Sequence, residues 1–244
     1  MHEFARTRLL LGDTAMDRLA AARVAVFGIG GVGGYVVEAL ARSGVGALDL
    51  VDSDTISLSN INRQIIALHS TVGLYKVDVA AQRVHDINPA CEVRAFRTFF
   101  LPETAADFDF AAYDYVVDAV DTVKAKMGII LAAQSARVPV ISCMGAGNKL
   151  DPLAFRIADI YDTSVCPLAR VMRTQCRKAG IAALKVLYST EPPLTPGDGT
   201  IEEPLPQGKR SLPGSCSFVP SVAGLIIASE VIRELTGQNR THQD

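Results

Sequence analysis

A glycine motif between an apolar run and an amphipathic stretch is the feature that most restricts how this chain can fold. Arg23–Phe27 (RVAVF) is short and apolar, and Gly28, Gly30 and Gly33 follow it in the pattern G-x-G-x-x-G. Apolar side chains then recur at helical spacing over Gly31–Ser43. A buried strand, a tight turn and a helix in this order are typical of a nucleotide-binding β-α unit.

Buried strands and helices alternate along the rest of the chain. Strands are predicted at Leu48–Val51, Glu92–Phe96, Tyr115–Ala119, Val138–Cys143, Ala154–Ile160 and Ala183–Ser189, and helices at Val72–Ile87, Lys124–Arg137, Pro167–Ala179 and Val219–Leu235. This alternation is typical of a mainly parallel sheet with helices on both faces. We therefore predict an α/β, Rossmann-like, doubly wound fold whose divergent C-terminal third can add antiparallel strands.

Length and composition favour a single domain. The chain has 244 residues, 49% of them hydrophobic, which is enough for one large core. We expect residues 1–244 to form a single domain, with a nucleotide-binding part at about 1–145 and a substrate-facing part at about 146–244. A proline-rich long loop is predicted at 190–214.

The net charge, the cysteine spacing and the uncharged run argue against several classes of protein. A net charge of −2 argues against a chain built wholly for nucleic acid. None of the five cysteines is spaced as C-x-x-C, which weighs against a structural zinc site and a disulfide framework. The longest uncharged run, Ser211–Ser229, contains two prolines, so we predict a loop and a helix there and no transmembrane span. The N-terminus does not resemble a signal peptide, and we expect a cytoplasmic protein.

The glycines and one acid have definable tasks at a nucleotide. Gly28 allows the tight turn, Gly30 and Gly31 let a phosphate approach the backbone, and Gly33 lets the helix pack on the sheet. The phosphates then meet the positive end of that helix. Asp52 ends the second strand, 19 residues after Gly33, where a carboxylate can bind a ribose hydroxyl.

The segment that follows, SLSNINRQ, is unusually rich in polar side chains. It supplies Asn60, Arg63 and Gln64, and Lys76 comes thirteen residues after Arg63. An arginine forks onto phosphate oxygens and a lysine adds a point charge, so the set suits a triphosphate whose leaving pyrophosphate gathers charge. We expect ATP, with Asp54 also at the nucleotide. Asp121, after the fourth strand, is a candidate magnesium ligand.

Together these motifs resemble the ubiquitin-activating-like adenylyltransferases, which include the enzymes that activate sulfur-carrier proteins for thiamine and molybdopterin synthesis. The shared pattern is GxGGxG, VDxDxxxxSNxNRQ, Lys76 and DAVD, within the first 145 residues or so. The resemblance implies that Asp52 binds ribose and that Asn60, Arg63 and Lys76 bind phosphates. It also implies a homodimer in which Arg6 reaches the partner's nucleotide, although a solvated terminal charge explains Arg6 equally well.

Two later blocks resemble the tRNA threonylcarbamoyladenosine dehydratases. They are Ser142–Arg173 and Phe218–Leu235. That resemblance implies an ATP-dependent dehydration, through an acyl-adenylate, of threonylcarbamoyladenosine beside the tRNA anticodon. The main alternative is adenylation of the C-terminal carboxylate of a small sulfur-carrier protein, and a sulfur-transfer protein partner also stays open. A nicotinamide-dependent oxidoreductase and a nucleotide-sensing scaffold agree less well with Arg63 and Lys76.

Three arginines and two cysteines are further candidates for functional residues. Arg170, Arg173 and Arg177 share one face of a predicted helix and can contact tRNA phosphates, although an ordinary solvated face is the simpler interpretation. Cys166 and Cys216 lie in or beside predicted loops and are the candidates for an acyl-accepting thiol. Most cysteines of this kind are simply small buried residues.

Overall fold

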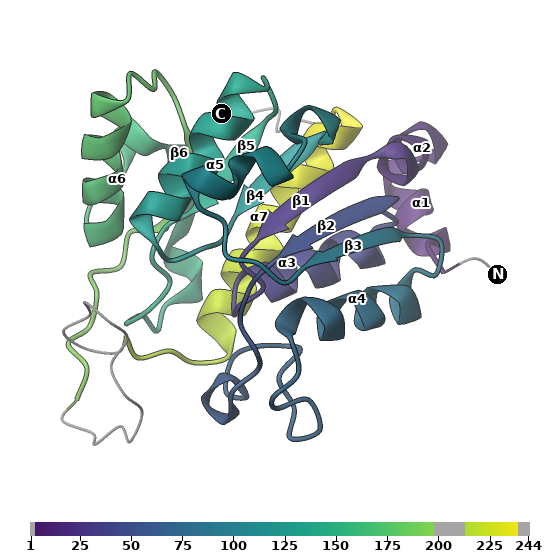
Figure 1. Ribbon diagram of the computed structural model, residues 1–244, viewed down its shortest axis with the longest axis horizontal. Coiled ribbons are helices and arrows are strands. Elements are labelled where there is room, and N and C mark those ends of the chain that lie inside the picture. The colour runs from purple at the N-terminus through teal and green to yellow at the C-terminus, as the bar shows by residue number, and fades with distance from the viewer. Residues whose placement is uncertain (1–2, 198–212, 239–244) are drawn as a thin grey trace.

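The seven strands of the described chain form one sheet in the order β3-β2-β1-β4-β5-β7-β6 (Figure 1). The computed structural model describes residues 3–197 and 213–238. The strands are β1 Arg23–Phe27, β2 Ala47–Val51, β3 Glu92–Phe96, β4 Tyr115–Asp118, β5 Val140–Cys143, β6 Phe155–Asp159 and β7 Lys185–Ser189. Every neighbouring pair is parallel except β6 and β7, which are antiparallel. The predicted Rossmann-like fold with an antiparallel addition in the C-terminal third is therefore confirmed.

Helices cover both faces of this sheet. The α-helices are α1 Ala5–Leu11, α2 Asp13–Ala21, α3 Gly33–Arg42, α4 Lys76–Ile87, α5 Val123–Ser135, α6 Pro167–Lys178 and α7 Phe218–Thr236. Short 3-10 turns are η1 Leu58–Asn60, η2 Pro102–Asp107, η3 Phe110–Ala112, η4 Pro152–Ala154 and η5 Ile160–Asp162. Helices α3, α4 and α7 share one core cluster with the sheet, whereas α5 and α6 pack on the opposite face. No helix within residues 3–197 and 213–238 has the length and apolar content needed to cross a bilayer.

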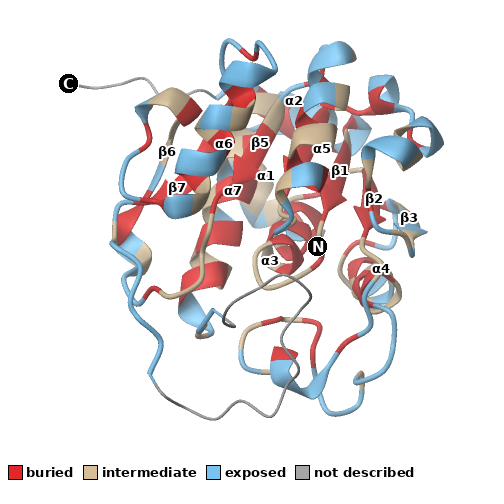
Figure 2. Cartoon of the chain, turned by 60° about the vertical axis from the view of Figure 1, so that its left-hand side comes forward, coloured by how far each residue is buried: buried red, intermediate tan, exposed pale blue. Residues whose placement is uncertain are grey.

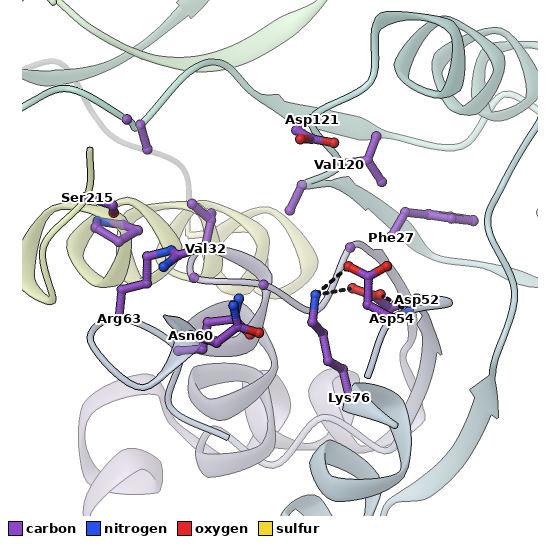
Figure 3. A pocket seen from close by; sticks show the side chains of 18 of the residues that line it. Phe27, Val32, Asp52, Asp54, Asn60, Arg63, Lys76, Val120, Asp121 and Ser215 are labelled. Atoms are coloured by element: carbon purple, nitrogen blue, oxygen red, sulfur yellow. Dashed lines mark hydrogen bonds and ion pairs between the residues drawn. The ribbon is translucent and has the colours of Figure 1, made fainter. Parts of the chain in front are cut away.

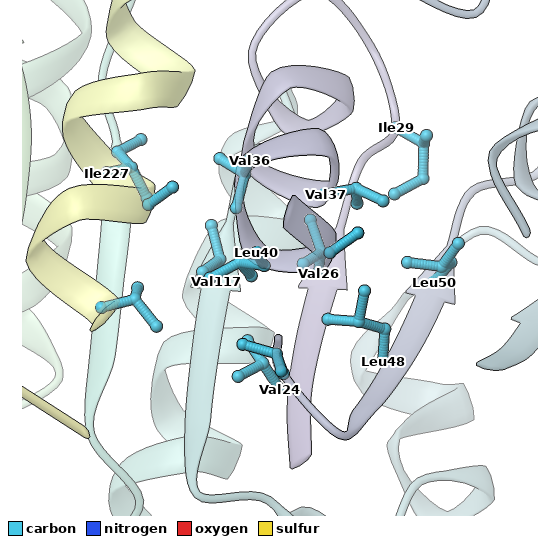
Figure 4. Close-up of a cluster of buried hydrophobic side chains, with 14 of the residues drawn as sticks. Val24, Val26, Ile29, Val36, Val37, Leu40, Leu48, Leu50, Val117 and Ile227 are labelled. Carbon is cyan, nitrogen blue, oxygen red and sulfur yellow. The ribbon is translucent and has the colours of Figure 1, made fainter. Parts of the chain in front are cut away.

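The core explains why the strand sequences are apolar on both faces. On one side, Val26 and Leu50 pack with Leu40 of α3 and Ile227 of α7 (Figure 4). On the other side, Phe27 stacks on Phe110 with ring centroids 5.7 Å apart. Figure 2 follows this layering: the central strands are buried and the outer helix faces are exposed, whereas the edge strand β3 is mostly exposed and β6 is mostly half-buried. The central strands therefore exclude water on both faces, as a parallel sheet requires.

Two local features differ from the sequence prediction. The predicted helix Val72–Ile87 begins only at Lys76. The residues just before it bond instead to the start of the crossover segment, residues 52–75, which joins β2 to α4. Gly73 donates its N–H to the Ile56 carbonyl, and Ile56 donates to the Leu74 carbonyl, both at 2.8 Å. The helices α1 and α2 were not predicted. Of the predicted loop 190–214, residues 198–212 lie outside the described part of the chain.

Candidate active site

A pocket of about 660 Å³ opens at the carboxyl ends of β1, β2 and β4. The chain leaves β1 toward β2 on one side, while β4 pairs with β1 on the other, so this is the point where the strand order reverses. Ligands of open α/β sheets bind at such a switch point. Gly28 and Gly30, Asp52 and Asp121 line the pocket from these three strand ends.

The glycine loop closes the bottom of the pocket without side chains. Gly28 has a φ of +89°, and a Cβ there would lie 2.8 Å from the Ala119 carbonyl oxygen of the neighbouring β4 end. A Cβ on Gly33 would lie 1.8 Å from the Gly28 oxygen, so α3 packs against the loop only because this residue is glycine. At Gly30, the nearest atom to a Cβ would be Gln64 Nε2 at 4.0 Å, which leaves open space toward the pocket.

Asp52 is fixed beside this loop by backbone donors. Its carboxylate accepts the Ile29 N–H at 2.7 Å and the Asp54 N–H at 2.8 Å. Burial raises the pKa of Asp52 above its ordinary value, while the Lys76 charge and the two backbone N–H groups oppose that rise. The carboxylate is therefore oriented toward the pocket in one position.

Lys76 brings a positive charge to the same place from the first turn of α4. Its side chain is only 8% exposed, and Nζ lies 2.6 Å from the Asp54 carboxylate and 3.9 Å from that of Asp52 (Figure 3). Asp54 itself is 65% exposed. The lysine is thus held by one acid that water and ligands can reach, and an incoming anion can compete for it.

The crossover segment supplies the remaining predicted side chains. Asn60 is buried and its Oδ1 accepts the Ser57 N–H at 3.2 Å. Arg63 donates to the Ser59 carbonyl and to Asn62 Oδ1, both at 2.9 Å. Gln64 Oε1 is the buried side-chain polar atom that lacks a hydrogen-bond partner within residues 3–197 and 213–238. An unpartnered buried oxygen is costly, and at a pocket it indicates a ligand donor.

Figure 3 shows how these groups are divided across the pocket. Arg63 lies on one side with Ser215, and Lys76, Asp52 and Asp54 lie on the other. Asp121 is exposed at the rim that follows β4, and its neighbour Thr122 donates a hydroxyl to it at 3.3 Å. The arrangement provides two cationic side chains, a glycine loop and several carboxylates around one cavity, which is suitable for a phosphorylated nucleotide.

Comparison with known proteins agrees with this geometry. The model of the ThiF family matches residues 4–244. The chain belongs to the ThiF family. The tRNA threonylcarbamoyladenosine dehydratase of Bacillus subtilis is 44% identical over 242 residues, covering 96% of this chain and 95% of that protein. The Escherichia coli enzyme of the same name is 34% identical over 248 residues, covering 95% of this chain and 92% of that one.

Solved structures share the fold of this chain. The E. coli dehydratase TcdA in complex with ATP superposes with a TM-score of 0.87 at 32% identity, over 97% of this chain and 94% of that one. The same protein has been crystallised with AMP. E. coli MccB is 18% identical with a TM-score of 0.68, and this chain spans 64% of it. That second likeness concerns the fold alone.

Arg6 and the three arginines of α6 in this ThiF-family chain lie away from the pocket. Arg6 is exposed on α1, which precedes the amino end of β1, and it does not line the cavity of its own chain. Arg170 is exposed on α6. Arg173 is half-buried and donates to the carbonyl and hydroxyl oxygens of Thr163, the carbonyl at 2.8 Å. The guanidinium of Arg177 lies 5.3 Å from the Tyr161 ring centroid. Two of the three arginines, Arg173 and Arg177, therefore have structural partners that their spacing did not indicate.

The cysteines differ in their access to solvent. Cys91, Cys143, Cys166 and Cys176 are buried, and Cys216 is half-buried. Burial raises the pKa of the Cys91 thiol to about 11 and that of Cys143 to about 12. Cys166, a predicted thiol candidate, is thus enclosed in the core, and Cys216 is the one cysteine that is half-buried.

Sequence reasoning missed one wall of the pocket. Ala146 and Gly147 follow β5, and Pro213, Gly214 and Ser215 precede α7; all five line the cavity. The glycines of MGAGNK, placed directly after a predicted strand, were a usable signal for the first part of this wall. Nothing in the local sequence indicates that a segment some 66 residues later completes it.

Proposed function

We propose that this chain is an ATP-dependent dehydratase that cyclises N6-threonylcarbamoyladenosine beside the tRNA anticodon through an acyl-adenylate. The observation that carries the proposal is the full-length similarity to the B. subtilis enzyme, 44% over 242 residues. It coincides with a pocket whose glycine loop, carboxylate and cations are what an adenylating enzyme needs.

In this proposal ATP lies across the carboxyl ends of β1 and β2. Asp52 accepts a ribose hydroxyl, because a carboxylate has about four lone-pair sites and only two are taken by Ile29 and Asp54. The phosphates lie over the Gly30 backbone at the start of α3. Lys76 exchanges its Asp54 partner for phosphate oxygens, and Asn60, Arg63 and Gln64 complete the site.

The reaction needs no protein nucleophile. A carboxylate oxygen of the threonine group attacks the α-phosphorus of ATP, and the bond to the β-phosphate oxygen breaks to release pyrophosphate. A second group of the same side chain then attacks the acyl carbon, and AMP leaves with the former carboxylate oxygen. The attacking group gives up its proton and the carboxylate oxygen leaves in AMP, so the side chain loses the elements of water. The protein contributes positioning and a charge clamp of Arg63 and Lys76 on the leaving groups.

Asp121 is the residue that would hold magnesium. It is an exposed carboxylate on the rim of the pocket, and Asp52 is across the same cavity. Mg²⁺ in nucleotide sites usually takes one or two carboxylates together with phosphate oxygens and water. The donor set fits that requirement, and the ion would neutralise charge that develops on the phosphates.

A homodimer explains the position of Arg6. Leu9 and Leu10, on the same helix, are 88% and 83% exposed. Large apolar side chains at this exposure favour self-association. In the dimer, Arg6 would enter the partner's pocket and add a third positive charge to the phosphates.

Partners and location follow from the substrate. Arg170 and Arg177 on α6 would contact tRNA phosphates, whereas Arg173 mainly supports Thr163. A tRNA substrate supports a cytoplasmic location. A sulfur-transfer protein remains a family-derived expectation, and co-purification with the intact enzyme would test it.

The test is direct product analysis. The protein is incubated with ATP, magnesium and tRNA carrying threonylcarbamoyladenosine, the tRNA is digested under mild conditions, and the modified nucleoside is weighed. We expect an ATP-dependent loss of one water, matched by AMP release. An unchanged mass, with the protein folded and binding ATP, would favour the alternative, adenylation of a carrier protein's C-terminal carboxylate.

A further inference from the structure

The two walls of the pocket differ in charge. Asp52, Asp54 and Lys76 lie on the side of the pocket built by β2 and α4, and Arg63 of the crossover segment lies across the cavity beside Ser215. The wall built by residues 146–147 and 213–215 contributes alanine, glycine, proline and serine, and no charged side chain. We expect the triphosphate to extend between Lys76 and Arg63 over the glycine loop, which leaves the uncharged wall for the other reactant.

Asn148 ties the uncharged wall together. Its backbone N–H donates to the Gly214 carbonyl at 2.8 Å, and its side-chain Oδ1 accepts the Gly214 N–H at 2.6 Å. Its own carbonyl accepts the Leu194 N–H at 2.8 Å. One residue thus fixes two chain segments, around positions 194 and 214, that lie on either side of a long excursion in sequence.

The chemistry of asparagine suits this position. Asn148 has a φ of +59°, in the left-handed region that asparagine tolerates better than most residues. The neighbouring Gly147 permits the close approach, because a Cβ there would lie 2.9 Å from Pro213 Cβ. At the other end of the wall, Asn62 Nδ2 donates to the Ser215 carbonyl at 3.0 Å. The wall segment is therefore suspended between Asn148 and the crossover segment that carries Arg63.

We infer that Asn148 is a positioning residue for the acceptor, the carboxylate-bearing tRNA nucleoside, and not for ATP. The inference rests on the proposed dehydratase function. Residues 213–215 form the uncharged side of the cavity, and an uncharged wall suits a flat, neutral nucleobase and keeps water from the carboxylate. Loss of the Asn148 side-chain bond frees the wall while the cationic side stays intact.

Three variants separate the loss of the Asn148 side-chain hydrogen bond from the effect of a substitution at a positive φ. Asn148→Gly keeps the positive φ and removes the acceptor oxygen. Asn148→Asp keeps an acceptor oxygen at the same place and serves as the conservative rescue. Arg137→Gly is the matched control, because Arg137 also has a positive φ of 60° but is exposed at the end of α5, outside the pocket.

Cys216 provides a readout that does not depend on tRNA. It lies directly after the wall segment, its thiol is 3.9 Å from the Lys149 carbonyl, and it is half-buried while the other four cysteines are buried. Its alkylation rate therefore reports on the mobility of residues 213–216. Steady-state kinetics with tRNA and a calorimetric titration with ATP complete the experiment.

For Asn148→Gly we expect faster Cys216 alkylation and a KM for tRNA raised about fivefold, the change that one neutral hydrogen bond supports, with the ATP Kd within about twofold of wild type. Asn148→Asp should match wild type in Cys216 alkylation, because it keeps the acceptor for the Gly214 N–H, and Arg137→Gly should match wild type in all three measurements. If wild type fails to dehydrate tRNA, the proposed function is wrong and the inference falls with it. If wild type is active, an unchanged KM for tRNA, or a parallel loss of ATP affinity, overturns the inference alone.

Discussion

Two buried lysines, each paired with an aspartate, show how the same ion pair serves two regions differently. Lys126 of α5 lies 2.9 Å from Asp118 at the end of β4, and both side chains are 0% exposed. Lys76 of α4 lies 2.6 Å from Asp54, which is 65% exposed. Asp118 also accepts the Ser142 hydroxyl at 2.5 Å and the Val120 N–H at 3.2 Å, so its partners are internal.

The comparison separates a closed pair from an exchangeable one. The Asp118 pair joins β4, β5 and α5, and its low-dielectric surroundings make either partner costly to remove. The Asp54 pair faces a cavity, where a ligand phosphate can replace the carboxylate. We therefore expect Lys126 to determine stability and Lys76 to determine catalysis.

Lys126→Met should reduce the free energy of unfolding by about 3–5 kcal/mol, because it leaves the Asp118 carboxylate buried without its charge partner. Urea denaturation measures the change. The matched control is Lys124→Met, which removes an exposed pair with Glu103 and should cost about 0–1 kcal/mol. Equal effects of the two substitutions would contradict the distinction between closed and open pairs.

Lys76→Met should fold with nearly wild-type stability and lose AMP formation by about 100-fold or more, since it removes a preorganised charge from the leaving groups. Single-turnover release of AMP and pyrophosphate measures the loss, and urea denaturation controls for folding. A variant that turns over at the wild-type rate would show that the phosphates bind elsewhere.

Arg6→Ala should lower turnover about 100-fold, because one charge-assisted contact to the phosphates is lost. If Arg6 acts across a dimer, mixing Arg6→Ala with Arg63→Ala subunits restores one complete site per mixed dimer. Equal mixing should then recover about a quarter of wild-type activity. Recovery to no more than the average of the two variants would place Arg6 outside the partner's site.

The smallest effect concerns pH. Burial raises the pKa of Asp52, and the ionised form is the one that accepts a ribose hydroxyl. ATP affinity should therefore fall as the pH drops through this raised pKa, at a higher pH than for an ordinary aspartate. Calorimetric titrations across that window measure it. Asp52→Asn should bind ATP more weakly at neutral pH and lose this dependence, and an unchanged pH profile in the variant would assign the titration to another group.

Local patterns predicted much of this structure. All seven strands were predicted, most of them from apolar runs, because a parallel sheet buried on both faces requires near-continuous hydrophobic sequence. Glu92–Phe96 was predicted from its alternating pattern, and it is the mostly exposed edge strand β3. The glycine loop, Asp52 and Lys76 could also be predicted to meet, since the carboxyl ends of parallel strands lie at one edge of the sheet. Spacing along the chain was sufficient for these residues.

The features that the sequence did not reveal depend on contacts between distant segments. Arg173 was predicted on a basic helix face, but one nitrogen of its guanidinium, Nη1, donates to Thr163. The start of α4 was misplaced because residues 73–74 bond to Ile56 across the crossover segment. The role of Asn148 requires Gly214, 66 residues away, and no periodicity records such a pairing.

The central claim is that this pocket activates a carboxylate as an acyl-adenylate. The most direct measurement uses tRNA whose threonylcarbamoyladenosine carries oxygen-18 in the threonine carboxylate, followed by mass analysis of the released phosphates. The account predicts one labelled oxygen in AMP and none in pyrophosphate. Unlabelled AMP from a dehydrating reaction, or label in inorganic phosphate, would contradict it.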